Sequence, residues 1–375
     1  MMHAIYQYFY EPETWLSFVR LFQYITFRTA YAAVTSLIMC WGLVWWLTPR
    51  FRSWNLAQRD LRPFLEFQEG KEGTPTMGGL LLVFSVIMST VIWADLSNRF
   101  IQMILFVMVT LGLLGALDDW YKMRTPETDG LSVKTKLLVQ LIVGVVVGLW
   151  LIREPLPIRL LWLSEEFRYE LSQSLFLPFM KEVWLPLGLL YIPLVIIVVI
   201  GTSNAVNLTD GLDGLAIGSV TFCAVAYGAM AYISGHYMFS EYLQVPNIRG
   251  SGELTVFVAA LIGAALGFLW FNAHPAQIFM GDAGSLPLGG SIGILAVIIK
   301  QELLLVVVGG IFVIEALSVF AQIGCYKLTG RRLLKMAPLH HHFELKGVEE
   351  SKITIRFWIV GIILALIALS TLKLR

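Results

Sequence analysis

The sequence predicts an all-α integral membrane protein, a polytopic bundle of about ten transmembrane helices. Hydrophobic residues make up 57% of its 375 residues and charged residues only 14%, well below the roughly 25% found in soluble domains. Ten runs with few or no charges can each cross a bilayer core, which takes about 20 apolar residues. Because a polytopic bundle of this length is normally one unit, we expect residues 1–375 to form a single domain.

The gaps between charges locate the predicted helices. The first run follows Arg28 and is too long, and too far from the N-terminus, for a cleaved signal peptide, so we expect a retained helix. The ten runs are 29–49, 73–94, 100–117, 137–152, 183–209, 214–240, 254–281, 283–299, 303–326 and 357–372. Residues 153–182, rich in proline and aromatic side chains, predict a short interfacial helix or hairpin between two of them.

The basic residues predict the orientation. The connections after the first, third, fifth, seventh and ninth helices carry 16 lysines and arginines, and the opposite side carries 10. By the positive-inside rule, the first set of connections faces the cytoplasm and both termini lie outside. A net charge of +1 without a long basic block gives no indication of nucleic-acid binding. The three cysteines are widely spaced within apolar runs, which favours buried thiols over disulfides or metal ligands.

Adjacent aspartates, Asp118 and Asp119, close the third predicted helix on the cytoplasmic side. Neighbouring residues on a helix point about 100° apart, so one carboxylate can face an ion directly while the other flanks it. Oxygen ligands at this position suit Mg²⁺, which binds through one or two carboxylates and substrate phosphates. The alternative is a solvated helix end without a bound ion.

Two further acidic motifs lie on the same side. Asn207 and Asp210 recur at helical spacing with two glycines in NAVNLTDGLDGL, where two helices meet. A turn that caps the next helix would explain only part of this string. In FMGDAGS, Asp282 stands between glycines that allow a metal or phosphate to approach, although capping is again an alternative. Asn272 and Phe279 supply an amide and an aromatic face for a flat heterocycle.

A run of three histidines, His340–His342, lies in the connection before the last helix. Three consecutive histidines cannot all bind one metal from a helix, because ligands there need spacings of three or four, so zinc is disfavoured. Imidazoles can instead donate hydrogen bonds to phosphates near neutral pH. The glycine-rich stretch GKEGTPTMGG opens the second helix on this side without the Walker pattern, and alone is a weak signal.

Five strings together resemble the phospho-N-acetylmuramoyl-pentapeptide-transferase family, within the polyprenyl-phosphate N-acetylhexosamine-1-phosphate transferase superfamily. They are GTPTMGG, LDDWYK, NAVNLTDGLDGLA, FMGDAGSLPLG and APLHHHFE. The resemblance runs from about Lys71 to Glu344, and the ten-helix count agrees with the family's architecture. It implies Mg²⁺-dependent transfer of phospho-MurNAc-pentapeptide from UDP-MurNAc-pentapeptide to undecaprenyl phosphate, giving lipid I and UMP in peptidoglycan synthesis. It also implies a bacterial inner-membrane location and a homodimer.

The resemblance also implies roles for individual residues. Asp282 falls on the metal-binding aspartate, and Asp118 and Asp119 fall on the catalytic pair. The uridine pocket is implied at Lys71, Asp213, Asn272 and Phe279. Phosphate-handling and supporting positions are implied at Thr76, Lys122, Lys134, Asn207, Asp210, His340 and His341. Because the second pKa of a phosphate monoester is near 6, most acceptor is already dianionic at pH 7. We therefore expect direct attack by the lipid phosphate rather than a covalent intermediate on Asp118 or Asp119.

Three alternatives remain from the sequence. A membrane prenyltransferase would carry DDxxD-like clusters, but Lys122 stands where the third aspartate would be. A secondary transporter would place its polar residues near the bilayer midplane, whereas here they lie at helix ends. The exception is Glu315, in the middle of the ninth predicted helix, which we expect to face the bundle or a groove. A GlcNAc-1-phosphate transferase that uses UDP-GlcNAc differs mainly by the histidine run.

Overall fold

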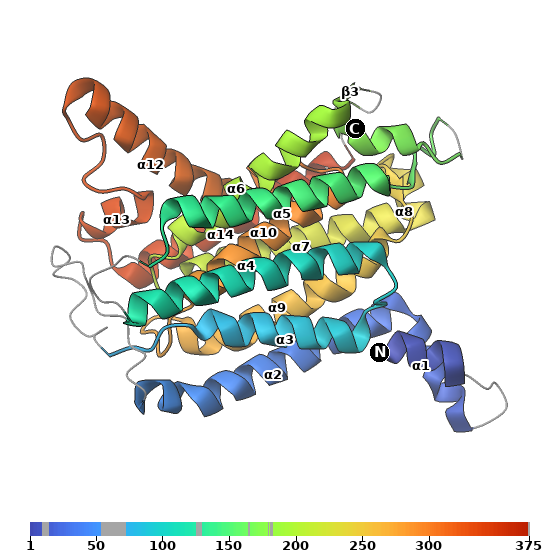
Figure 1. Cartoon of the computed structure of the whole chain (residues 1–375), viewed down its shortest axis with the longest axis horizontal. Helices are drawn as coiled ribbons and strands as arrows, with labels where there is room; N and C mark the ends of the chain where they lie inside the picture. Colours follow the sequence, from blue (N-terminus) through green and yellow to red (C-terminus); the bar gives the residue numbers. More distant parts are fainter. Residues whose placement is uncertain are drawn as a thin grey trace.

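The computed structural model describes residues 1–9, 15–53, 73–124, 130–163, 166–178, 180 and 183–373. Within these ranges there are ten helices of 16 or more residues, most of which run side by side, whereas α12 projects from the bundle (Figure 1). They are α2 (Ile25–Ser53), α3 (Gly78–Trp93), α4 (Arg99–Arg124), α5 (Val133–Arg153), α6 (Tyr191–Thr209), α7 (Leu215–Gly235), α9 (Leu254–Asn272), α10 (Asp282–Ile298), α12 (Gly310–Thr329) and α14 (Glu350–Thr371). Eight are long and apolar enough to cross a membrane, whereas α3 and α10 are apolar but shorter. The polytopic helical bundle is confirmed, and the count of ten spans stays a prediction.

The remaining described elements are short and lie mostly at the helix ends. The helices are α1 (Met2–Phe9), α8 (Tyr237–Leu243), α11 (Leu305–Val308), α13 (Leu339–Glu344) and the 3₁₀ helices η1 (Trp15–Gln23), η3 (Tyr169–Gln173), η4 (Gly188–Leu190) and η5 (Ser251–Glu253). The strands are β1 (Ile158–Arg159), β2 (Ser174–Phe176), β3 (Trp184–Pro186) and β4 (Asn247–Ile248). β1 pairs with β4 and β2 with β3, both antiparallel. Residues 153–182, where a short helix or hairpin was predicted, contain η3 and β2, whereas β3 lies in the predicted helix 183–209, which begins as α6 only at Tyr191.

Several predicted helix limits were wrong. α2 begins at Ile25, so Arg28 lies inside the helix rather than at its start, where the buried carboxylate of Glu253 pairs with its guanidinium. An internal partner lets a charge lie within an apolar bundle. The run 303–326 is interrupted at Gly309 between α11 and α12, and α9 ends at Asn272, leaving residues 273–281 as a loop.

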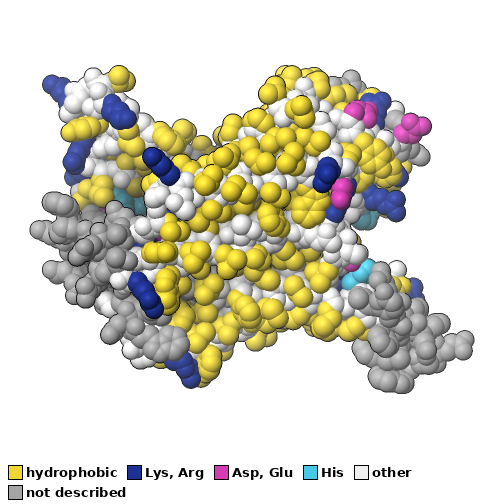
Figure 2. Space-filling model, viewed as in Figure 1, with side chains coloured by type: hydrophobic (Ala, Val, Ile, Leu, Met, Phe, Trp, Pro, Cys, Tyr) yellow, Lys and Arg dark blue, Asp and Glu magenta, His cyan; other side chains and the backbone are white. Residues whose placement is uncertain are grey.

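The surface divides as expected for a membrane protein. Figure 2 shows hydrophobic side chains across the middle of the long helices, with lysine and arginine mainly toward the two ends. In the same view α12 stands away from the bundle and leaves a hollow beside α6. An apolar surface between two charged ends is what a protein surrounded by lipid is expected to have.

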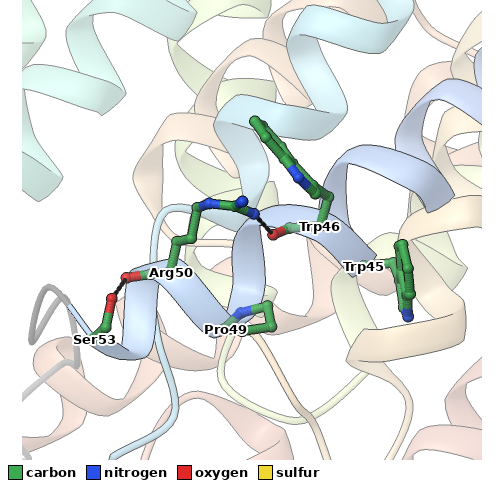
Figure 3. A pocket seen from close by; sticks show the side chains of 5 residues that line it. All are labelled: Trp45, Trp46, Pro49, Arg50 and Ser53. Carbon is green, nitrogen blue, oxygen red and sulfur yellow. Dashed lines mark hydrogen bonds between the residues drawn. The ribbon is translucent and has the colours of Figure 1, made fainter.

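Aromatic and basic residues meet where α2 ends. Trp45, Trp46, Pro49, Arg50 and Ser53 line an open pocket of about 510 Å³ (Figure 3). The Arg50 guanidinium lies 4.0 Å from the centre of the Trp46 ring and donates to the Trp46 carbonyl oxygen. Tryptophan and arginine together are typical of the membrane–water interface, so this pocket lies at the edge of the apolar belt.

Close packing of α3 and α4 against α10 positions the loops that carry the site. The loop before α3 and the loop before α10 bond through their backbones, with Phe279 N–H donating to Pro75 O and Gly78 N–H donating to Phe279 O. On α4, Gly115 lies so close to α10 that a Cβ there would stand 2.0 Å from the Asp282 carbonyl oxygen. The two aspartate motifs on α4 and α10 are thereby brought together.

Candidate active site

Three carboxylates from two helices converge at one end of the bundle. Asp118 and Asp119 lie near the end of α4, which continues to Arg124 instead of closing at the pair as expected, and Asp282 begins α10. One ligand oxygen from each lies within 4.8 Å of the others, and all three side chains are buried. The Asp119 carboxylate accepts from the backbone N–H groups of Asp282 and Ala283, at 3.2 and 3.0 Å. The start of α10 therefore fixes the orientation of Asp119.

Two lysines lie among these acids. Lys122 Nζ lies 2.7 Å from Asp118 Oδ2 and 3.1 Å from Asp282 Oδ2. Lys136, in the first turns of α5, reaches the same two oxygens at 2.8 and 3.0 Å. Each lysine thus bridges α4 and α10, and the cluster combines three acids with two cations. An anionic substrate and a divalent cation can both be accommodated by such a mixture of charges.

The α6 end contributes amide and carboxyl groups. Asn207 donates to Asp282 Oδ1 at 2.6 Å and to Ser285 Oγ at 2.9 Å. Asp210 follows α6, where desolvation, then the nearby Asp282 and Asp119 carboxylates, raise the pKa of its carboxyl group to about 8. A fourth acid in this position prefers to hold a proton until a cation compensates its charge.

The residues expected at a nucleotide pocket lie beside this cluster. Asp213 Oδ2 accepts from Ala276 N–H at 3.0 Å and lies 3.1 Å from His274 Nδ1. Asn272 accepts from Gly214 N–H and donates to the Ile278 carbonyl oxygen, so it ties the α6–α7 turn to the loop that carries Phe279. Both Asp213 and Asn272 are buried, and Phe279 is half-buried.

Thr76 is brought to the same end by the loop before α3. It is buried, and its hydroxyl and the Asp119 carboxylate both flank the Gly281 backbone. Gly281 precedes Asp282, so the GTPTMGG and FMGDAGS strings form one continuous wall of the site.

The histidine run lies on α13, over the α6–α7 turn. His340 Nδ1 lies 3.1 Å from Glu315 Oε2, and its backbone N–H donates to Glu315 Oε1. Glu315 is fully buried, which confirms that it faces the bundle. His341 Nδ1 pairs with Glu344 at 2.9 Å, and His342 accepts from Lys335 N–H. The three rings have separate partners, consistent with the prediction that they do not share one metal.

One nitrogen of His340 has no hydrogen-bond partner within the described part of the chain. Its Nε2 is buried and lies against Gly211, where a Cβ would stand 2.2 Å away. A buried polar atom without a partner is costly, and this one is directed at the turn beside Asp210. It is therefore available to a ligand that reaches the turn.

The three carboxylates fit a hard divalent cation. Oxygen-only donors within bonding reach of a common point are what Mg²⁺ binds, and Asp118, Asp119 and Asp282 provide them. A second group of possible ligands comprises Asp213, His274 and Glu350. It includes a half-exposed histidine, whereas the first group offers three buried carboxylates and oxygen donors alone, so the first group is the better site for Mg²⁺.

Two predicted positions are not in the cluster. Lys71 lies outside the described residues. Lys134 is exposed on α5, and no contact places it at the carboxylates. Lys136, two residues further, was not predicted but reaches them. A charge at the start of a helix was visible in the sequence, whereas the choice between two nearby lysines depends on which side of α5 faces α4.

Comparisons with known proteins agree with these observations. The model of glycosyl transferase family 4 matches residues 101–300, and the phospho-N-acetylmuramoyl-pentapeptide-transferase signature 1 matches residues 71–83. A phospho-N-acetylmuramoyl-pentapeptide-transferase from Desulforapulum autotrophicum is 48% identical over 372 residues, 99% of this chain and 100% of that protein. Proteins of the same name from Solidesulfovibrio magneticus and Syntrophus aciditrophicus are 49% identical over 364 residues (96% of each chain) and 45% identical over 374 residues (99% and 100%).

Proposed function

The chain belongs to the phospho-N-acetylmuramoyl-pentapeptide-transferase family, and from this premise we propose its reaction and site. It transfers phospho-MurNAc-pentapeptide from UDP-MurNAc-pentapeptide to undecaprenyl phosphate, giving lipid I and UMP in peptidoglycan synthesis. The observation that carries the proposal is the convergence of Asp118, Asp119 and Asp282 with Lys122 and Lys136 at one end of an apolar bundle. This site can meet a soluble nucleotide on one side and a membrane-held acceptor on the other.

The charges of the site suit the transfer of a phospho-sugar between two anions. Mg²⁺ held by Asp118, Asp119 and Asp282 would neutralise the donor diphosphate and stabilise the leaving UMP. Lys122 and Lys136 would exchange part of their contact with the acids for contact with phosphate oxygens. Asn207 orients Asp282, and the Nε2 of a protonated His340, whose Nδ1 pairs with Glu315, would donate to a phosphate oxygen beside Gly211.

The contacts of the two aspartates on α4 support direct attack by the lipid phosphate. Asp118 Oδ1 accepts from Leu131 N–H at 2.8 Å, and its Oδ2 faces two lysines. Both oxygens of Asp119 accept from backbone N–H groups. A carboxylate held in this way positions cations and phosphates well but is a poor nucleophile. We therefore propose that they orient the reactants while the acceptor dianion attacks.

Location and assembly complete the proposal. The chain is a multi-pass membrane protein, and we propose that it lies in the bacterial inner membrane with the site in the cytoplasm and both termini outside. Residues 1–375 act as a single catalytic domain in contact with membrane lipid. We also propose a homodimer, as in the family. No nucleic acid takes part.

Donor choice tests the function. Purified protein with Mg²⁺ and undecaprenyl phosphate receives either UDP-MurNAc-pentapeptide or UDP-GlcNAc, and UMP release is measured. We expect release with the first donor only. Release with UDP-GlcNAc alone would replace the proposed substrate with that of a GlcNAc-1-phosphate transferase, and release with neither would contradict the reaction.

The metal site has its own test. Asp282→Asn removes a charged ligand at the centre of the cluster and should lower turnover at saturating Mg²⁺ at least about a hundredfold, with the folded protein recovered in detergent. Asp95→Asn, outside the site between α3 and α4, is the matched control and should retain activity. Activity of Asp282→Asn within about threefold of wild type would refute the metal role.

A secondary transporter is the alternative from another class. Its best support in the sequence was Glu315, an acid in the middle of a helix. In the structure both oxygens of the Glu315 carboxylate pair with His340. Glu315 therefore positions a histidine of the site and is not favoured as a residue on a transport path. The enzyme is therefore favoured.

A further inference from the structure

The last helix contacts the turn between α6 and α7 through a regular set of side chains. Glu350, Thr354 and Trp358 are spaced four residues apart and therefore lie on one face of α14. Each makes a hydrogen bond to the backbone of Asp213 or Gly214. We call these three residues the α14 ladder.

The three contacts hold two consecutive residues of the turn. The Glu350 carboxylate accepts from Asp213 N–H at 2.7 Å, and the Thr354 hydroxyl donates to the Asp213 carbonyl oxygen at 3.2 Å. The Trp358 indole N–H donates to the Gly214 carbonyl oxygen at 3.3 Å. A donor and two acceptors of one turn are thus satisfied by a helix about 140 residues further along the chain.

The packing around Trp358 is specific to its indole. A Cβ on Gly218 would stand 2.1 Å from the indole nitrogen, so the absence of a side chain there leaves the room that the ring needs. The Phe222 ring meets the indole edge-on, with centroids 6.2 Å apart. Through Trp358, the ladder therefore packs against α7 as well as bonding the turn.

The turn held by α14 is also part of the nucleotide pocket. Gly214 N–H donates to Asn272, and Asp213 accepts from Ala276 N–H on the opposite loop. Glu350 Oε2 lies 3.5 Å from His274 Nδ1, so the ladder touches that loop too. A shift of α14 would change the separation of the two loops between which a flat base would lie.

We propose that Glu350, Thr354 and Trp358 are positioning residues that hold the Asp213–Gly214 turn in the geometry that binds the nucleotide of the donor. The inference rests on the proposed function and deepens it, because it predicts which substrate each residue affects. The hydrogen bonds of the three go to the Asp213–Gly214 turn, and not to Asp118, Asp119 or Asp282, so the ladder should govern affinity for the uridine nucleotide and leave the chemical step unchanged.

The test measures donor and acceptor kinetics separately and adds direct binding of UMP by calorimetry. Thr354→Val and Trp358→Phe each remove one neutral hydrogen bond, so both should raise the donor KM and the UMP Kd about two- to tenfold. Glu350→Ala removes a charged acceptor and should raise them about tenfold or more, whereas Glu350→Gln keeps an acceptor oxygen and should recover much of that loss. The kcat and the acceptor KM should stay within about twofold of wild type.

Thr371→Val is the matched control, since the Thr371 hydroxyl donates within α14 itself and is also buried. It should leave all four quantities unchanged. The inference would be overturned if the ladder variants lowered kcat, or if they raised the acceptor KM as much as the donor KM. It would also be overturned if they behaved like Thr371→Val. Should Trp358→Phe fail to fold, Thr354→Val and Glu350→Gln still decide the question. Wild type that binds UMP but transfers no phospho-sugar would count against the proposed reaction alone, because the binding comparison would still test the ladder.

Discussion

At the scale of single residues, the two lysines of α5 make a sharp comparison. Lys136 bridges Asp118 and Asp282, whereas Lys134 is exposed. We expect Lys136→Met to lower kcat/KM about a hundredfold or more, the usual loss when a charge that stabilises a transition state is removed. Lys134→Met should cost less than about threefold. Equal losses, measured by UMP release, would contradict the placement of Lys136 at the reacting phosphates.

The raised pKa of Asp210 predicts how stability depends on pH. The pKa of the Asp210 carboxyl group is about 8 in the folded protein and ordinarily near 3.8. Between about pH 4 and 8, the folded protein therefore keeps a proton on Asp210 that the unfolded chain has already lost. Stability therefore falls as pH rises through this window. Without Mg²⁺, we expect wild type to gain thermal stability relative to Asp210→Asn when the pH is lowered from 8 to 6. A constant difference between their melting temperatures would show that Asp210 keeps its ordinary pKa.

The predicted site residues that the structure brings together share a property. They occur in short strings where the chain is expected to return to one membrane face. Asp118, Asp119, Asp282 and Asn207 meet as expected. The partners that hold them are isolated in sequence. Glu315, which pairs with the His340 ring, lies 25 positions before it in the sequence. Glu350, which accepts from the Asp213 N–H, lies 137 positions after it. No local pattern marks such pairs, because they arise from helix packing.

At the scale of elements, the contact of α4 with α10 determines whether the acids can meet. A Cβ on Gly115 would overlap the backbone of α10 at Asp282 and Ala283, so Gly115→Ala must push the two helices apart. We expect it to lower the melting temperature, because overpacking costs about 1–3 kcal/mol, and to raise the Mg²⁺ concentration needed for half-maximal activity.

Gly201→Ala on α6 is the control for this change. Nothing lies within 4 Å of a Cβ there, and alanine is the better helix former, so stability should hold or rise slightly. A Gly115→Ala protein with unchanged melting temperature and Mg²⁺ requirement would contradict the close contact of α4 and α10.

The polytopic helical bundle could be predicted from charge spacing, whereas the helix limits could not. Apolar composition does not distinguish a helix from the loop beside it, which is why residues 273–281 were included in a predicted helix that ends at Asn272. That loop carries Phe279, whose backbone N–H donates to the Pro75 carbonyl oxygen in the segment before α3. The short length of α3 has the same origin, because residues 73–77 of its predicted run belong to the loop before the helix.

At the scale of the whole molecule, the end of the bundle with more lysines and arginines is also the end that holds the carboxylate cluster. The connection that carries α13 and its histidines holds seven of the sixteen lysines and arginines on its side, and four of the ten on the opposite side fall in residues 153–182. Since the hydrophobic surface separates these two ends, the positive-inside rule supports the proposed assignment of the carboxylate cluster to the cytoplasm. That assignment also suits a donor that is a charged, soluble nucleotide.

Cysteine labelling tests this orientation. In a Cys325→Ser background, where the remaining Cys40 and Cys223 are buried, Glu170→Cys and Arg331→Cys each place a thiol at an exposed position near opposite ends of the bundle. A membrane-impermeant maleimide applied to intact spheroplasts should label the Glu170→Cys protein and leave the Arg331→Cys protein unlabelled. Both should react after permeabilisation, which controls for access. Labelling of Arg331→Cys alone in intact cells would invert the bundle and place the carboxylates on the side that a cytoplasmic nucleotide cannot reach.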